Sequence, residues 1–209
     1  MSQVRFPFAF PAATVASIML ATALGGTAAL AAEGVRTRGS VVSLEGAKLV
    51  VHPKTGADVT IDLADKFAVL AVVKSSMAEI KPGTFIGTAT TTKPDSTLRS
   101  VEVVVFPEGM KGTGEGHYPW DLPGSSAMTN ATVTNAVKGV DGQTVTVSYK
   151  GGEKKVEIPA DVPVVTLVPA TAADIMPGAA VFVPGQREAD GSLHAGVVLF
   201  GKDGLVPPM

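Results

Sequence analysis

The chain contains no cysteine, and this absence excludes several kinds of site at once. Disulfides, thiol nucleophiles, iron–sulfur clusters and cysteine-built zinc sites all need thiols. Charge is also scarce, because charged residues make up 17% of the 209 residues, and 17 basic against 19 acidic side chains give a net charge of -2. A chain without a basic excess lacks the electrostatic field that draws proteins to nucleic acid, so we expect no nucleic-acid partner.

Glycine, proline and β-branched residues are plentiful instead. There are 23 Gly and 15 Pro, many Val and Thr, and only 5% aromatic residues. This composition predicts a β protein with many tight turns. The length allows one large domain or two small ones.

The first 31 residues have the layout of a secretory signal. Arg5 precedes an uncharged run, and the run ends in small residues just before Glu33. A positive start, an apolar middle and an A-x-A site are what a signal peptidase recognises. We predict a signal peptide over residues 1–31, cleaved after Ala31, and hence a periplasmic or secreted protein that has no membrane association after cleavage. The alternative is an uncleaved anchor, because about 20 apolar residues can span a bilayer.

The remaining sequence reads as two copies offset by 95 to 97 residues. Glu45-Gly46 matches Asp141-Gly142, each pair lying between two β-like runs as a tight turn does. Ser76-Met77-Ala78-Glu79 matches Thr171-Ala172-Ala173-Asp174, and each is followed by isoleucine and then Pro-Gly. A hydroxyl residue with an acid three positions later is a capping pattern, and Pro-Gly stops the helix that it begins. Each copy is therefore expected to contain a single helical turn.

Each copy also contains five or six short β-like runs. Closing so small a sheet into a barrel removes its exposed edges, and the order of strands and helical turn is that of the OB-fold. We predict an all-β fold with a first OB-like barrel over residues 39–106, a connecting loop over 107–130, a second OB-like barrel over 131–200 and a C-terminal tail over 201–209. A barrel of roughly 70 residues is only marginally stable alone, so the two should pack against each other.

Three features of the repeats resemble a bacterial family of exported OB-like barrels, the domain of unknown function 5666. They are the Gly-x-Val-x-x-x-(Glu/Asp)-Gly opening from Gly39 to Gly46, the Pro-Gly before the fourth strand, and the closing Leu-x-x-x-Val-x-(Val/Leu) strand, which the second copy matches from Leu193 to Leu199. The second copy departs from the opening, because Asn135 stands where the first copy has Gly39 or Ser40. The resemblance implies the fold and provides no catalytic residues.

The connecting loop has no counterpart within the repeats. It contains the only tryptophan of the chain and crowds four chemically distinctive residues together: His117, Tyr118, Trp120 and Asp121. A plain linker would be polar and rich in Gly, Ser and Pro throughout. Long non-repeating loops on a compact scaffold often carry function.

Three interpretations of this loop compete. Tyr118 and Trp120 form an apolar plug between the barrels in the first. In the second, Glu115, His117 and Asp121 bind a transition metal such as Cu or Zn, with a methionine as a soft extra ligand. In the third, the aromatic residues Tyr118 and Trp120 bind a polymer or another protein.

No arrangement typical of an enzyme is visible. The chain has no phosphate-binding G-x-x-x-x-G-K-[ST] loop, no H-E-x-x-H and no G-x-S-x-G elbow, and its acids are scattered singly in turns. We therefore predict no catalytic residues and an exported, non-enzymatic binding or scaffold protein whose partner is another protein, a small ligand or a metal ion. The alternative is a periplasmic transition-metal-binding protein that uses the His117 loop.

Overall fold

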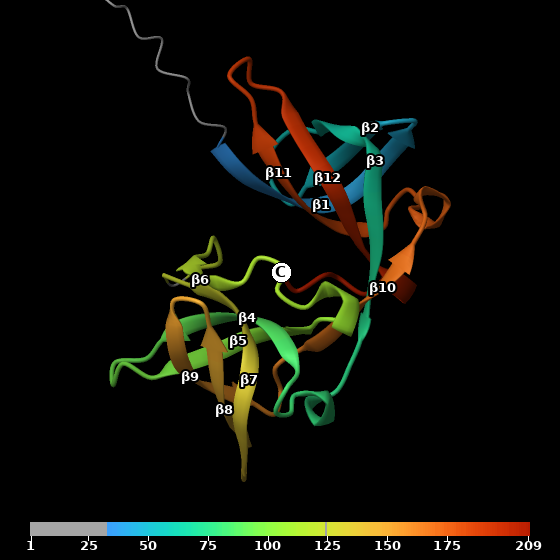
Figure 1. Cartoon of the computed structure of the whole chain (residues 1–209). Helices are drawn as coiled ribbons and strands as arrows, with labels where there is room; N and C mark the ends of the chain where they lie inside the picture. Colours follow the sequence, from blue (N-terminus) through green and yellow to red (C-terminus); the bar gives the residue numbers. More distant parts are fainter. Residues whose placement is uncertain (1–32, 124) are drawn as a thin grey trace, which may run out of the picture. The chain divides into compact units, whose positions relative to one another are not determined.

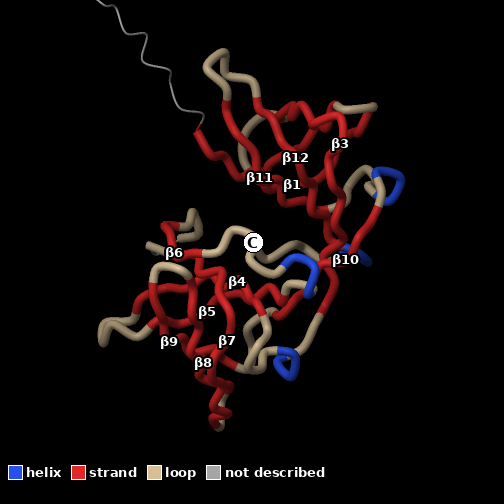
Figure 2. The backbone as a smooth tube through the Cα atoms, in the orientation of Figure 1, coloured by secondary structure: helices blue, strands red, loops and turns tan. Residues whose placement is uncertain are grey.

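The computed structural model describes residues 33–123 and 125–209, and these residues form an all-β structure. Twelve strands and four isolated 3-10 turns make up the described part, and the turns are the only helical segments there (Figure 2). No helix in this part combines the length and apolarity that a membrane crossing needs. The predicted signal peptide, residues 1–31, lies outside the described residues.

One barrel has five strands. They are β1 (Glu33–Glu45), β2 (Lys48–Pro53), β3 (Val59–Lys74), β11 (Ala180–Arg187) and β12 (Leu193–Gly201). Each strand pairs with the next around the ring, and β12 closes it by pairing in parallel with β3. The alternate side chains that point inward form its core, with Leu49, Val51 and Val198 fully shielded from solvent. We call it barrel A.

The other barrel also has five strands. They are β4 (Phe85–Thr92), β5 (Leu98–Val105), β7 (Ala127–Gly139), β8 (Gly142–Tyr149) and β9 (Gly152–Pro159). A parallel pairing of β5 with β9 closes this ring. Its core consists largely of β-branched residues such as Ile86, Val145 and Val156. We call it barrel B. The prediction of an all-β chain with two small barrels is confirmed.

The predicted composition of the two barrels is wrong, because the repeats exchange strands. The first repeat supplies β1 to β5 and the second supplies β7 to β12, yet each barrel combines the first three strands of one repeat with the last two of the other. Figure 1 shows this directly, since blue and red strands share barrel A while green, yellow and brown strands share barrel B. Neither residues 39–106 nor residues 131–200 form a barrel by themselves. Equivalent strands present the same apolar faces, so either arrangement satisfies the hydrophobic pattern.

A pseudo-twofold axis relates the two repeats. β3 pairs antiparallel with β10 (Val164–Ala170), and in this ladder Val72 lies opposite Leu167. These two residues are equivalent at an offset of 95, so the axis passes between them. β10 also pairs in parallel with β5, which joins the ladders of both barrels into one sheet.

The two Pro-Gly motifs mark the places where each repeat crosses to the other. The Gly83 amide donates to the Val133 carbonyl at 2.8 Å, and the Gly178 amide donates to the Val41 carbonyl at 2.7 Å. Val41 and Val133 each begin a bulge in the first strand of their repeat. The motif thus both ends a helical turn and docks on the opposite repeat.

The predicted helical turns are present as η1 (Met77–Glu79) and η3 (Ala172–Asp174). At η3 the Asp174 carboxylate accepts hydrogen bonds from the backbone N–H and the hydroxyl of Thr171, both at 2.8 Å. Ser76 makes no equivalent side-chain cap at η1. The capping pattern therefore predicted the position of both turns, although the side-chain capping hydrogen bonds form only at η3.

Asn135 is not the counterpart of Gly39 or Ser40. The bulges align Val133 with Val41 and place Asn135 at the position of Ser43. Beyond the bulge, the β7–β8 hairpin is two residue pairs longer than the β1–β2 hairpin. A single offset of 95 to 97 residues therefore misaligned the first strand of the second repeat with that of the first.

Candidate functional site

The connecting segment 107–130 is not an open loop. It contains the turn η2 (Glu108–Met110) and the short strand β6 (Gly116–Pro119), which pairs antiparallel with the start of β7. Trp120 continues this ladder, because its amide donates to the Ser126 carbonyl at 2.8 Å. The segment therefore folds back on barrel B and carries its aromatic residues in a fixed register.

Trp120 lies among side chains from both barrels. Its ring centroid is 6.2 Å from that of Tyr118 and 6.2 Å from that of Phe182 on β11. The same cluster contains Val104 of β5 and Leu167 of β10. This placement agrees with the interpretation of Trp120 and Tyr118 as an apolar plug.

Two arginines of β1 cover the aromatic rings. The Arg36 guanidinium carbon lies 4.0 Å from the centre of the Trp120 ring, and that of Arg38 lies 5.0 Å from the centre of the Phe182 ring. A guanidinium over an aromatic face is attracted by the ring quadrupole, typically by about 0.5–2 kcal/mol. The Arg36–Trp120 contact connects barrel A to the segment that folds on barrel B, whereas Arg38 and Phe182 both belong to barrel A.

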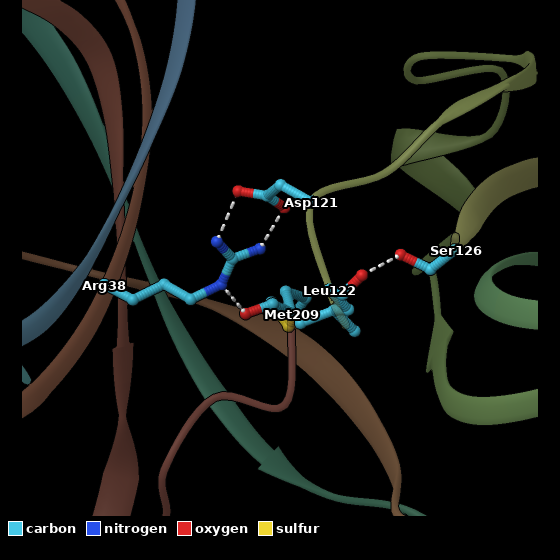
Figure 3. Close-up of polar contacts among 5 residues, drawn as sticks. All are labelled: Arg38, Asp121, Leu122, Ser126 and Met209. Carbon is cyan, nitrogen blue, oxygen red and sulfur yellow. Dashed lines mark hydrogen bonds and ion pairs between the residues drawn. The ribbon is translucent and has the colours of Figure 1, made fainter. Parts of the chain in front are cut away.

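Arg38 is also fixed by Asp121 and by the C-terminal segment (Figure 3). Its two terminal nitrogens donate to the two Asp121 carboxylate oxygens at 2.7 and 2.8 Å, and its Nε donates to the Met209 backbone oxygen. The hydrogen bonds from Arg38 hold the pKa of Asp121 below its usual value. We call the group Arg36, Arg38, Trp120, Asp121 and Met209 the latch.

Glu102 is a buried acid close to the latch. On β5 its neighbours Val103 and Val105 point into the core of barrel B, so Glu102 points out of that barrel. It is only 1% exposed, and within the described residues neither carboxylate oxygen has a hydrogen-bond partner. Burial raises the pKa of Glu102 to about 8, nearby Arg38 lowers it and nearby Asp121 raises it further. Glu102 is therefore mostly protonated at neutral pH.

The strand register explains why Glu102 lies on the same surface as the aromatic residues. Glu102 on β5 pairs with Ala89 on β4, Ala89 with Met128 on β7, and Met128 with Tyr118 on β6. Paired residues project from the same face of a sheet, so this row ends with Glu102 and Tyr118 on one side. Burial raises the pKa of Tyr118 as well. The sequence did contain a signal for Glu102, an acid that interrupts the valine run from Val101 to Val105.

The three predicted metal ligands engage different partners. His117 Nδ1 lies 2.8 Å from the Thr129 hydroxyl, and its ring stacks on Tyr149 at 6.3 Å. Burial and nearby Lys154 lower the pKa of His117. Glu115 accepts a hydrogen bond from the Lys150 amide at 3.0 Å, and Asp121 belongs to the latch.

These residues are not brought together. In the described part of the chain no group of three or more His, Asp or Glu side chains is placed to hold a metal ion. β6 alternates its side chains, so His117 faces Thr129 on one side while Tyr118 belongs to the Met128 row on the other. Closeness in sequence therefore did not produce closeness of the ligands.

Comparisons with protein-family models, with curated proteins and with solved structures give no match. The resemblance to the domain of unknown function 5666 stays a prediction. What the protein does has to be inferred from its own residues.

Proposed function

We propose that this protein is an exported, non-enzymatic binding or scaffold protein of the bacterial periplasm, in which two barrels present their surfaces as one unit. The observation that carries the proposal is the latch. Trp120 and Asp121, two of the most distinctive residues of the connecting segment, contact Phe182 and Arg38 of barrel A. A segment that joins the barrels in this way has a structural role. We therefore expect a ligand or partner to bind on the surfaces of the barrels.

The surface of barrel B offers a recess in keeping with this role. OB-type barrels bind ligands along one face and its flanking loops. A hollow of about 320 Å³ lies beside the β4–β5 turn, and Leu98, Thr144 and Lys155 are among its lining residues. Glu157, which also lines the hollow, forms an ion pair with Lys93 at 2.8 Å.

The metal-binding alternative requires rearrangement. Asp121 would have to leave Arg38, and His117 would have to turn from Thr129 while Glu115 left Lys150. No contact in the described residues favours that movement. Metal binding by these three residues would therefore cost the hydrogen bonds that they now make.

The test uses the full chain expressed with its own leader in a Gram-negative host. We expect the protein in the periplasmic fraction with Ala32 as its mature N-terminus. Trp120→Ala should lower the free energy of unfolding by about 3 kcal/mol, as loss of a packed aromatic does. Chelators should leave the unfolding of the wild-type protein unchanged.

His117→Ala is the matched control, because it alters the same connecting segment without touching the latch. Cytoplasmic protein with an intact leader would overturn the proposed location. Stoichiometric Cu or Zn uptake that His117→Ala removes would establish the alternative in place of the proposal.

A further inference from the structure

A groove of about 560 Å³ opens at one end of barrel A. It lies among the ends of β10, β11 and β12, the turn η3 and the turn η4 (Lys202–Gly204). Its volume falls in the range of roughly 300–1,000 Å³ that is common for small-molecule sites. Ala180, Met176 and Val206 are among the residues that line it.

Because the two repeats are related by the pseudo-twofold axis, the groove can be compared with the equivalent place in the first repeat. Phe85 pairs with Thr132, one residue before the bulge that begins at Val133, and Ala180 pairs with Ser40, one residue before the bulge at Val41. Ala180 is therefore the counterpart of Phe85. The pairs Ile86–Val105 and Val181–Phe200 match in the same way, which makes Gly201 the counterpart of Phe106.

The first repeat has aromatic rings at Phe85 and Phe106, whereas the counterparts in the second repeat, Ala180 and Gly201, have none. Phe85 is 3% exposed, and its ring centroid lies 5.3 Å from that of Phe106. At Gly201 the C-terminal segment occupies the space, because a Cβ there would lie 1.5 Å from the Leu205 carbonyl oxygen. No aromatic residue stands at Ala180, and the groove lies there; the aromatic residue among its lining residues, Phe200, belongs to the core of barrel A, where it pairs with Val181.

The rim of the groove changes from charged to apolar between the repeats. Lys81 has Met176 as its counterpart at the offset of 95, and Met176 and Val206 are both 62% exposed. Both side chains line the same hollow, so they give it an apolar surface against which a ligand can pack.

The charged lining favours a cation. Asp174 and Asp203 contribute two carboxylates, against one ammonium from Lys202. The hydrogen bonds from Thr171 lower the pKa of Asp174, so this carboxylate is ionised at neutral pH. An amino group on a ligand could pair with either acid while a ring entered the apolar part.

We propose that this groove binds a small molecule that combines one aromatic ring with a cationic amino group. The ring takes the place that Phe85 fills in the first repeat, between Met176 and Val206, and the ammonium group faces Asp174 and Asp203. This inference rests on the proposed binding function and names a ligand class for it.

The experiment titrates the isotope-labelled protein with 2-phenylethylamine while its amide NMR signals are followed. We expect saturable shifts confined to the groove. Phenylacetate, which has the ring but the opposite charge, and hexylamine, which has the charge but no ring, should each bind at least tenfold more weakly. An absence of saturable shifts, equal binding of either comparison compound, or shifts centred on Trp120 would overturn the proposal.

Two variants locate the site. Ala180→Phe restores the residue of the first repeat and should abolish the shifts. Met176→Lys restores the exposed counterpart Lys81 without touching the core, and should weaken binding at least tenfold even if Ala180→Phe does not fold. Val137→Lys, at a 59% exposed position on the β7–β8 hairpin, is the control and should bind like the wild type.

Wild-type affinity in Met176→Lys would contradict the placement. If phenylethylamine does not bind, the proposed exported scaffold function still stands. Periplasmic location and the effect of Trp120→Ala on stability test that function separately.

Discussion

Glu102 and the latch show how single residues couple the two barrels. Glu102 lies in β5 of barrel B, while Arg38, which partly offsets its raised pKa, lies in β1 of barrel A. Asp121 interacts with both residues, since it accepts hydrogen bonds from Arg38 and raises the pKa of Glu102. The protonation of one buried acid is therefore linked to contacts between barrels.

The buried acid makes stability depend on pH. Between the ordinary value of 4.5 and the folded pKa of about 8, the folded state holds the Glu102 proton and the unfolded state does not. The contribution of Glu102 to stability should therefore be fully present below pH 4.5, fall as pH rises to about 8 and level off above it. The expected slope is at most about 1.4 kcal/mol per pH unit.

Glu102→Gln should remove this slope, because the amide keeps the shape without a titrating proton. We expect the variant to be more stable than the wild type at pH 9 and close to it at pH 5, as measured by urea unfolding at both values. Parallel pH profiles for the two proteins would contradict the buried, protonated state.

The Arg38–Asp121 pair should contribute modestly. Its side chains are 26% and 39% exposed, so solvent screens the attraction even though the geometry is bidentate. Arg38→Lys should lower the free energy of unfolding by roughly 1 kcal/mol, since lysine keeps the charge but loses the fork. A double-mutant cycle with Asp121→Asn measures the coupling, and additive effects would show that the pair contributes nothing.

At the scale of elements, the Pro-Gly turns connect local chemistry to the exchange of strands. Gly83 and Gly178 have φ angles of 91° and 83°, which glycine adopts without penalty, and their amides hold the bulges of the opposite repeat. The same two positions thus end a helical turn and begin the crossing.

Gly178→Ala should be destabilising by about 1 kcal/mol or more, through backbone strain alone. An added Cβ meets nothing within 4 Å, so no steric clash contributes. Gly34→Ala is the matched control, because its φ is not in the left-handed region and its Cβ would also meet nothing within 4 Å. Thermal unfolding of the two variants makes the comparison, and equal losses would exclude φ as the cause.

At the scale of the whole molecule, strand exchange makes the two barrels interdependent. Neither barrel can close without strands from both repeats, because β11 and β12 complete barrel A while β4 and β5 complete barrel B. Unfolding should therefore be a single cooperative transition.

Cleavage between the repeats tests this dependence. A protease site inserted at Thr113, in an exposed turn before β6, would separate β1 to β5 from β6 to β12. The nicked chain should elute as one complex under native conditions and melt in one transition. Fragments that separate, each retaining a folded barrel, would show that the barrels are continuous in sequence.

The sequence by itself determined the local structure of this protein. Alternating apolar residues set the strands, glycines set the turns, and a capping pattern followed by Pro-Gly set the isolated helical turns, because each of these signals acts over a few residues. It also singled out Tyr118, Trp120 and Asp121 as unusual, although it could not say what they contact. Arg38 lies 83 residues from Asp121 and 171 from Met209, so no local pattern connects them.

Only the tertiary structure decided which strands share a barrel. Two repeats with equivalent apolar faces can close separately or by exchange with nearly the same burial, so the choice depends on how residues 75–84 and 171–179 cross between them. That choice placed Glu102 against the latch and left the groove beside Ala180 without the ring that its counterpart provides.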